Sequence, residues 1–498
     1  MTNTAGLQAE TERRMERFLL DWLADESVPG ASVAIVADDE LVYADGFGSR
    51  NLAGNAPATA ETLYGMASVT KSFTGLAVGI LDERGEISVD DPIIDHLPEV
   101  GIEALDERGE PIGDDDPITL HHLLTHSSGL PSLGSSTVLL YRLTGVEEFG
   151  VPLGDHEDFR RHVAGAAEEV SDPPGERFMY CNEGYNLLGE VIERVSGQPY
   201  ETFVTEEILD PLGMERSTFD PSVVNGAVPP TRATGGHKEP ASAGQVVGVQ
   251  DPELPDAMTP YALQDGEPEA TPYPYRPVSL PAGGLIAPVT DLTRYLWMNA
   301  NSGALEGTQI VDPDTLARAH EGHVPDGDRH YGYGWSRREV SFLDRTLVGH
   351  GGSLGVSSSY VGFTTDGDYA VAIGANTTPG VTPPTVAQGV LAILEGEEPA
   401  DVVPHYAREA RFDELVGEYA GYRGIVEATV ERGGGALMLT VEGALGDTEL
   451  SLRPTDPAFP GYEFEAPSAS GTSATVTFRP DGDHVDLFYE RNRFHQES

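Results

Sequence analysis

The residues of this sequence with the clearest potential for chemistry are Ser68 and Lys71, the ends of Ser68-Val69-Thr70-Lys71. They open a segment, 68–83, whose apolar spacing predicts a buried helix ended by Gly85. Residues three apart share a helix face, so the Lys71 amine could lie beside the Ser68 hydroxyl. A serine hydroxyl becomes a good nucleophile when a neighbouring group takes its proton, and a lysine of lowered pKa can do so. The helix N-terminus also offers backbone N–H groups to a developing oxyanion.

Taken alone, this spacing is a weak signal, because a serine that caps a helix and a lysine that reaches solvent give the same pattern. Lysine is scarce here, however: only Lys71 and Lys238 occur among 498 residues. One of the two falls in this motif, which favours a role for the pair in catalysis.

Two downstream segments carry side chains that could serve a reacting serine. One is Tyr180-Cys181-Asn182, and the other is His350-Gly351-Gly352, followed by Ser353. Segments rich in Gly, Pro, Leu and aromatic residues frame them, at 118–130, 174–179, 184–189, 211–214, 281–285 and 331–335.

Together these motifs resemble those of the serine β-lactamase and penicillin-binding-protein superfamily, in the branch of class C β-lactamases, D-aminopeptidases and esterases. The resemblance covers about residues 10 to 395, and three motifs in the right order inside these frames are very specific. It implies an α+β protein with a β-lactamase/transpeptidase-like α/β sandwich. Both ends of that region would build one antiparallel sheet, a helical subdomain would be inserted, and the cleft would lie between them.

The resemblance implies a role for each residue of the first two motifs. Ser68 would be the acylated nucleophile, and Lys71 and Tyr180 would form the proton-transfer pair. Tyr180 would be kept acidic by the nearby ammonium, since an ordinary phenol has a pKa near 10. Whether Lys71 or Tyr180 is the acylation base stays open. Asn182 would contact Lys71 and donate its amide to the substrate carbonyl.

The third motif is expected to bind the substrate along an edge strand. His350 would orient the substrate or its leaving group, and Gly351 and Gly352 would let it approach the strand closely. The backbone N–H groups of Ser68 and Ser353 would form the oxyanion hole.

The sequence departs from the family pattern at two positions. Many relatives have lysine at the position of His350, and an unperturbed histidine is charged only below about pH 6.5. This weakens the case for a substrate with a carboxylate. Cys181 replaces the usual serine, and we interpret it as a small buried residue rather than a redox group.

Metals and organic cofactors are not expected. His122 and His126 are spaced to share a helix face, and His121 is adjacent, but the segment has no His-Glu-x-x-His pattern and no evident third ligand. We interpret these histidines as structural.

The amino-acid composition excludes some classes of binding partner. The chain has 82 acidic and 30 basic residues, so its formal charge is 30 − 82 = −52. Such a surface repels nucleic acids and anionic membranes. Many carboxylates, few lysines and 58 glycines are typical of a halophilic surface, where salt screens the repulsion. The single cysteine excludes an intramolecular disulfide. The polar N-terminal segment predicts no signal peptide, so we expect a cytoplasmic protein without a membrane span.

Periodicity predicts the order of the elements and three regions. A helix at 11–25 and a hairpin of 31–37 with 41–44 come first. Helices dominate 115–215, a loop-rich excursion covers 221–280, and strands return at 346–348, 358–363 and 369–375, followed by a helix at 385–394. We predict a hydrolase domain over 1–398, a linker over 399–411, and a lipocalin-like β-domain over 412–498, where short strands recur.

These observations predict a serine hydrolase that forms an acyl-enzyme on Ser68 and acts on small esters, amides or D-amino-acid peptides. A β-lactamase or penicillin-binding-type carboxypeptidase is the first alternative. A non-catalytic protein that binds a ligand or partner is the second. The expected partner is a small-molecule or peptide substrate, and homo-oligomer formation is left open.

Overall fold

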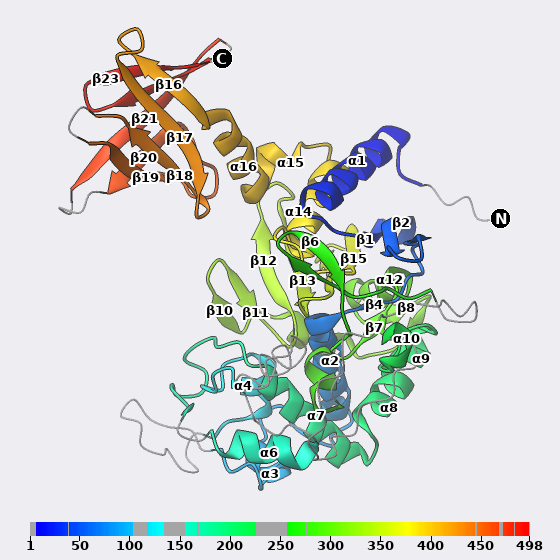
Figure 1. Ribbon diagram of the computed structural model, residues 1–498. Helices are drawn as coiled ribbons and strands as arrows, with labels where there is room; N and C mark the ends of the chain where they lie inside the picture. The colour runs from blue at the N-terminus through cyan, green and yellow to red at the C-terminus, as the bar shows by residue number, and fades with distance from the viewer. Residues whose placement is uncertain are drawn as a thin grey trace, which may run out of the picture. The chain divides into compact units, whose positions relative to one another are not determined.

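The computed structural model describes residues 6–37, 39–102, 117–133, 155–166, 169–225, 256–274, 277–443, 446–467, 472–482 and 484–497. The chain divides into two compact units, Met1–Ala387 and Gln388–Ser498. Each unit is described by itself (Figure 1).

The first unit is organised around a nine-stranded sheet whose order is β10-β11-β12-β13-β14-β15-β1-β2-β3. Its N-terminal strands are β1 (Gly30–Ala37), β2 (Glu40–Asn51) and β3 (Ala56–Pro57). The later strands are β10 (Val324–Asp326), β11 (Arg329–Tyr331), β12 (Ser336–Val340), β13 (Arg345–Ser353), β14 (Ser358–Thr364) and β15 (Tyr369–Ala375). All neighbours are antiparallel, and β1 joins β15 with Ala31 opposite Ala375. The predicted antiparallel sheet from both ends of this region is therefore confirmed.

Helices from both halves of the unit pack around this sheet. Helix α1 (Ala9–Asp25) lies against β2, and α12 (Val289–Ala300) packs against β1, β14 and β15. The first helix, the first strand of the hairpin and the three later strands appear within five residues of the predicted bounds, as does α14 (Pro383–Leu394). The second strand of the hairpin, predicted at 41–44, extends to Asn51.

The inserted helical part contains α3 (Ile93–His96), α4 (Leu120–Leu124), α6 (His156–Ala164), α7 (Asn182–Ser196), α8 (Tyr200–Val204), η4 (Thr205–Leu209), α9 (Asp210–Leu212) and α10 (Ser222–Asn225). Helix α2 (Thr70–Glu83) follows η1 (Ala67–Val69) and packs against α7, α8, α11 (Leu280–Gly283) and α13 (Pro313–His320). Residues 70–81 are all buried, because other elements surround α2. Gly85 ends it with φ +69°, as predicted.

Much of the predicted excursion, residues 226–255, lies outside the described residues. The described remainder includes a short hairpin of β5 (Tyr261–Gln264) and β6 (Glu267–Ala270). Two-residue strands β4 (Tyr64–Gly65) and β7 (Ile286–Ala287) pair just before the Ser68 segment, and β8 (Ala304–Leu305) pairs with β9 (Thr308–Gln309). A further short helix, η5 (Pro277–Ser279), leads into α11.

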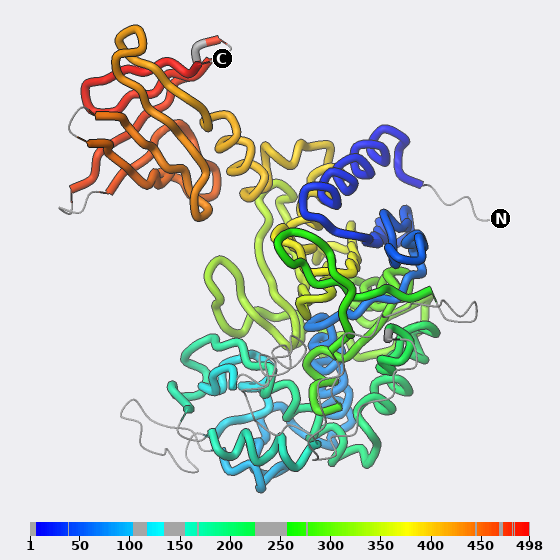
Figure 2. The backbone as a smooth tube through the Cα atoms, viewed as in Figure 1, coloured from blue at the N-terminus to red at the C-terminus, as the bar shows by residue number. Residues whose placement is uncertain are grey.

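The second unit is a closed barrel of eight strands, each paired with the next in sequence, and the last with the first. Figure 2 shows this continuous up-and-down course. The strands are β16 (Gly417–Gly421), β17 (Val426–Gly433), β18 (Ala436–Val441), β19 (Thr448–Pro454), β20 (Glu463–Pro467), β21 (Ser473–Asp481), β22 (His484–Tyr489) and β23 (Asn492–Gln496). Alternate residues such as Leu437, Leu439 and Phe494 fill its interior. The predicted C-terminal all-β barrel is confirmed.

The range predicted as a linker is helical. It contains α15 (Pro399–Val402) and most of α16 (Pro404–Leu415), whose Phe412 and Leu415 belong to the barrel core. Among the described residues, no helix has the length and apolar character needed to cross a bilayer.

Candidate active site

Ser68 lies in η1, the tight turn that leads into α2. The residue before it, Ala67, has φ +49°, a left-handed conformation that is unusual for a residue with a Cβ. Two contacts of Met66 fix this turn. The Ser359 hydroxyl donates to the Met66 carbonyl at 2.6 Å, and a Cβ added to Gly352 would lie 2.1 Å from the same oxygen. Glycine at 352 therefore allows β13 to lie against the Ser68 turn.

The Lys71 side chain reaches three oxygen atoms from inside the protein, and its exposed fraction is 0%. Its Nζ lies 3.0 Å from Ser68 Oγ, 2.7 Å from Asn182 Oδ1 and 2.7 Å from the Ala282 carbonyl oxygen. Burial lowers the pKa of Lys71 to about 7, and the nearby Glu183 carboxylate acts in the opposite direction. The predicted contacts of Lys71 with Ser68 and Asn182 are both present.

Tyr180 and Asn182 lie at the start of α7. Asn182 is the first residue of this helix, and Tyr180 lies two residues before it. Lys71 Nζ lies 5.0 Å from the centre of the Tyr180 ring. Although 36% of Tyr180 is exposed, desolvation of its hydroxyl raises the pKa of Tyr180, and a hydrogen-bonding interaction with Ser68 only partly offsets this. This direction is opposite to the lowering of the Tyr180 pKa that is expected from the Lys71 ammonium, because desolvation is the largest effect on the phenol.

His126 holds the backbone on both sides of Tyr180. Its carbonyl accepts from the Met179 N–H at 2.7 Å, and its Nδ1 accepts from the Cys181 N–H at 3.1 Å. Its ring lies against the Tyr180 ring, with 4.2 Å between centres, and its φ is +57°. Sequence reasoning assigned His126 to the framing segment and missed this contact, since 54 residues separate the two positions.

The neutral His126 ring carries one N–H proton, and the hydrogen bonds of the ring show on which nitrogen it lies. Because Nδ1 accepts a hydrogen bond, the neutral ring carries its proton on Nε2, which is buried and has no hydrogen-bond partner among the described residues. Burial and the Lys71 charge hold the pKa of His126 well below its usual range. His126 is therefore a neutral side chain beside the reacting groups.

The third motif occupies the last four residues of β13. Pairing with β12 ends at Ser336–Gly349, so residues 350–353 pair only with β14 in the part of the chain that the structure describes. The Leu354 N–H donates to the Ser357 carbonyl at 3.0 Å, and antiparallel pairs alternate between bonded and non-bonded. The next pair, Ser353–Ser358, is therefore non-bonded, and the Ser353 N–H points away from β14 toward the free edge.

His350 uses both ring nitrogens within the protein. Nδ1 lies 2.6 Å from the Gly351 carbonyl oxygen, which can only accept, so Nδ1 carries the proton. Nε2 then accepts from the Tyr331 hydroxyl at 2.8 Å. Burial and the Lys71 charge lower the pKa of His350 to about 3. The third motif therefore supplies no positive charge, even in mild acid.

The remaining candidate side chains have separate partners. His121 Nδ1 lies 2.8 Å from the Tyr333 hydroxyl, and His122 Nδ1 accepts from the Thr119 N–H in a capping box. Cys181 is buried, as predicted.

A cation that sequence reasoning missed lies near the site. Arg329, in β11, is exposed and forms an ion pair with Asp326 at 2.7 Å. Desolvation is the largest influence on the pKa of both Tyr180 and His350, and the Arg329 charge adds a smaller influence that acts to lower each of them. No short motif surrounds it that would have marked it in the sequence.

Comparison with known proteins agrees with this geometry. The family model described as Beta-lactamase matches residues 8–394, most of the chain. The chain belongs to the beta-lactamase family. A second model, the Pab87 octamerisation domain, matches residues 399–495 of this beta-lactamase family member.

Several relatives of this beta-lactamase family member are known. It is 29% identical over 213 residues to Protein flp of Staphylococcus aureus (strain MW2), a match that covers 43% of this chain and 39% of that protein's length. It is 29% identical over 359 residues to esterase EstB of Burkholderia gladioli, covering 70% of this chain and 84% of EstB. The solved octameric penicillin-binding protein homologue from Pyrococcus abyssi aligns with TM-score 0.80 and 31% identity, over 97% of this chain and all of the other.

Proposed function

We propose that this protein is a serine hydrolase in which Ser68 forms an acyl-enzyme. The observation that carries the proposal is the position of Lys71 Nζ, 3.0 Å from Ser68 Oγ. A hydroxyl and an amine at this distance can exchange a proton as the hydroxyl attacks a carbonyl.

Lys71, rather than Tyr180, is the proposed acylation base. In the neutral amine, two N–H groups donate to Asn182 Oδ1 and the Ala282 carbonyl, both at 2.7 Å. The lone pair then accepts the Ser68 proton. A pKa of about 7 leaves a large share of Lys71 neutral at physiological pH, whereas the raised pKa of Tyr180 keeps that phenol protonated.

The proposed acyl transfer has two halves, acylation of Ser68 and hydrolysis of the acyl-enzyme. Ser68 Oγ bonds to the substrate carbonyl carbon, and its proton moves to Lys71 Nζ. The bond to the leaving group breaks, and Tyr180 Oη gives its proton to the departing oxygen or nitrogen and recovers one from Lys71. In the second half, water attacks the ester on Ser68, and the same two groups carry the proton in the other direction.

The binding roles follow from where each group lies. The backbone N–H groups of Ser68 and Ser353 serve as the oxyanion hole, since the Ser353 N–H faces the free edge of β13. Asn182, held by Lys71 through Oδ1, presents its amide to the substrate carbonyl. Gly351 and Gly352 belong to the same edge, and His350 keeps it in place by bonding the Gly351 carbonyl rather than by touching substrate through a charge.

We propose small esters, amides or D-amino-acid peptides as substrates. The neutral His350 offers no positive charge to a substrate carboxylate. In addition, the match to esterase EstB covers 84% of the length of that relative. The β-lactamase or carboxypeptidase alternative is favoured by one observation, the nearby Arg329 cation. The non-catalytic alternative is opposed by the complete set of Ser68, Lys71 and Tyr180.

Two measurements on the same variants test the proposed acyl-enzyme: covalent labelling of Ser68 and hydrolysis of an ester. The wild-type chain should react with a fluorophosphonate at Ser68 and hydrolyse p-nitrophenyl acetate. Ser68→Ala should lose both while its circular dichroism stays unchanged, and Ser72→Ala, which removes a buried hydroxyl from the helix that follows, α2, is the matched control. Normal turnover by Ser68→Ala would refute the acyl-enzyme.

The C-terminal unit is proposed to assemble copies of this chain. The octamerisation-domain match and the octameric homologue support a homo-oligomer. The barrel also exposes apolar side chains at one turn, where Tyr422 is 65% and Ile425 is 83% exposed. Our proposed boundaries remain 1–398 for the hydrolase domain and 412–498 for the barrel.

A further inference from the structure

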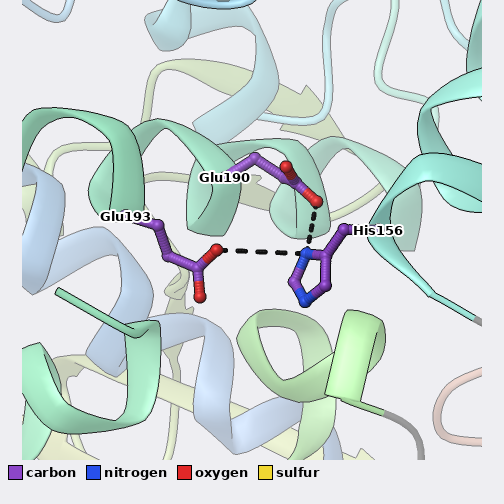
Figure 3. Close-up of side chains that lie close together, drawn as sticks. All are labelled: His156, Glu190 and Glu193. Atoms are coloured by element: carbon purple, nitrogen blue, oxygen red, sulfur yellow. Dashed lines mark hydrogen bonds and ion pairs between the residues drawn. The ribbon is translucent and has the colours of Figure 1, made fainter. Parts of the chain in front are cut away.

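A second cluster of reactive side chains joins α6 and α7, separate from the Ser68 site. It consists of His156, the first residue of α6, with Glu190 and Glu193 of α7 (Figure 3). His156 Nδ1 lies 2.6 Å from Glu190 Oε1 and 3.9 Å from Glu193 Oε2. One nitrogen and two carboxylate oxygens therefore converge, all within 4.8 Å of one another.

The second oxygen of each carboxylate is fixed by another donor. Arg160 Nη1 donates to Glu190 Oε2 at 2.5 Å, and the Tyr200 N–H donates to Glu193 Oε1 at 3.0 Å. These contacts turn the remaining oxygen of each carboxylate toward His156. Outer donors of this kind are what orient carboxylate ligands in metal sites.

The cluster borders a cavity of about 280 Å³. Asn186 lines the same cavity and lies on the face of α7 that carries Glu190 and Glu193, since the three positions are spaced i, i+4 and i+7. The Asn186 side chain is buried, with an exposed fraction of 3%, and its Oδ1 has no hydrogen-bond partner among the residues that the structure describes. A buried carbonyl oxygen without a donor is satisfied by a cation or by water.

We propose that His156 Nδ1, Glu190 Oε1 and Glu193 Oε2 bind one divalent transition-metal ion of the zinc type, beside the cavity that Asn186 also lines. An imidazole with two carboxylates is a donor set that suits Zn²⁺ better than Mg²⁺ or Ca²⁺, which prefer oxygen alone. Ligand bonds of about 2.0–2.2 Å place the atoms around a tetrahedral ion about 3.4 Å apart. Glu190 Oε1 would therefore move away from His156 Nδ1 by about 0.8 Å, and Glu193 Oε2 would approach it by about 0.5 Å, from their present 2.6 and 3.9 Å. The ion takes the place of the proton that His156 and Glu190 share, and that proton leaves to solvent.

The charges around the cluster favour this occupant. Glu190, Glu193 and the cavity-lining Glu201 bring three carboxylates, while Arg160 brings one permanent positive charge. An ion there would also tie α6 to α7, the helix whose first residue, Asn182, holds Lys71. The ion is therefore expected to stabilise the fold, and its binding does not require Ser68 chemistry.

The experiment uses the full chain, stripped with a chelator and dialysed in about 1 M KCl, which screens non-specific binding to the acidic surface. ZnCl₂ is titrated by calorimetry, and bound metal is counted by mass spectrometry. We expect one equivalent of Zn²⁺, a higher melting temperature, and visible absorption bands with Co²⁺. His156→Gln and Glu193→Gln should weaken Zn²⁺ binding at least about tenfold.

Glu157→Gln is the matched control, since it removes one exposed carboxylate from the same helix and should bind Zn²⁺ as the wild type does. The side chains of His156 and Glu193 are both partly exposed, at 39% and 30%, so both variants should keep a measurable fold. No saturable binding up to about 1 mM, or equal binding by Glu193→Gln and wild type, would overturn the proposal and leave an ion-pair cluster only. Binding of Ca²⁺ or Mg²⁺ in preference to Zn²⁺ would also overturn it.

Discussion

Lys71 Nζ lies 3.0 Å from Ser68 Oγ in a place where the lysine side chain has no exposure to solvent. Its nearest partners are oxygen atoms, and burial lowers its pKa to about 7. Desolvation thus converts an ordinarily protonated amine into a group that can accept the proton of its neighbour.

The first prediction concerns pH. Below its pKa Lys71 carries a proton and cannot accept one from Ser68, so kcat/KM for a neutral ester should rise with pH and level off, with an apparent pKa near 7. Lys71→Arg keeps a permanent charge and should lower kcat/KM by about 10³-fold. Lys238→Arg, which changes the other lysine, is the control. A flat profile between pH 5.5 and 8.5 would exclude Lys71 as the base.

The second prediction concerns His126 as a positioning residue for Tyr180. His126→Phe fills the ring space but removes the acceptor for the Cys181 N–H, at a cost of about 1–3 kcal/mol. We expect kcat to fall about tenfold to a hundredfold while KM changes less. Asn tolerates positive φ and offers an acceptor, so His126→Asn should recover most of the kcat. A wild-type kcat in His126→Phe with a lowered kcat in His126→Asn would show that His126 only fills space.

The third prediction concerns the substrate class. In molar salt above pH 7, kcat/KM for short p-nitrophenyl esters or D-aminoacyl anilides should exceed that for a chromogenic cephalosporin by at least about tenfold, or ~1.4 kcal/mol. The reason is that neutral His350 cannot hold the carboxylate of the cephalosporin.

Arg329→Ala provides the control for that comparison. It should leave ester hydrolysis within about twofold, and should lower any cephalosporin hydrolysis, because it removes the cation near Tyr180. If the cephalosporin is the better substrate in the wild type and loses its advantage in this variant, the β-lactamase alternative replaces our choice.

The fourth prediction concerns salt. The formal charge of −52 opposes folding at low ionic strength, and salt shortens the reach of the repulsion to about 3 Å at 1 M. The melting temperature measured by calorimetry should therefore rise steeply from about 0.1 to 3 M KCl. A melting temperature that does not change over this range would remove the halophile interpretation.

The fifth prediction concerns assembly. The double variant Tyr422→Ser and Ile425→Ser removes the exposed apolar turn of the barrel and should reduce the mass measured by light scattering. A chain shortened to residues 1–398 should be monomeric and still label at Ser68, since all three motifs lie within that range. A monomeric full-length wild type would refute the proposed homo-oligomer.

The sequence by itself predicted Ser68 and Lys71 as the candidate reacting residues, together with the elements that carry them. Ser68 and Lys71 lie three apart in a segment whose apolar spacing predicts a buried helix. The strands predicted at 358–363 and 369–375 are short apolar runs, and they correspond to β14 and β15. These patterns lie within short stretches of sequence, so they can be recognised without knowledge of the fold. The same holds for the barrel, whose short strands alternate between interior and solvent.

Only the tertiary structure decided the protonation states and the long-range contacts. Burial lowers the pKa of Lys71 and raises the pKa of Tyr180, the second in the direction opposite to expectation. His126 meets Cys181, and His156 meets Glu190, across gaps of 55 and 34 residues. The burial of these side chains and the contacts between them come from packing of segments that are far apart in the sequence. The periodicity of a single segment predicts neither the burial nor the contacts.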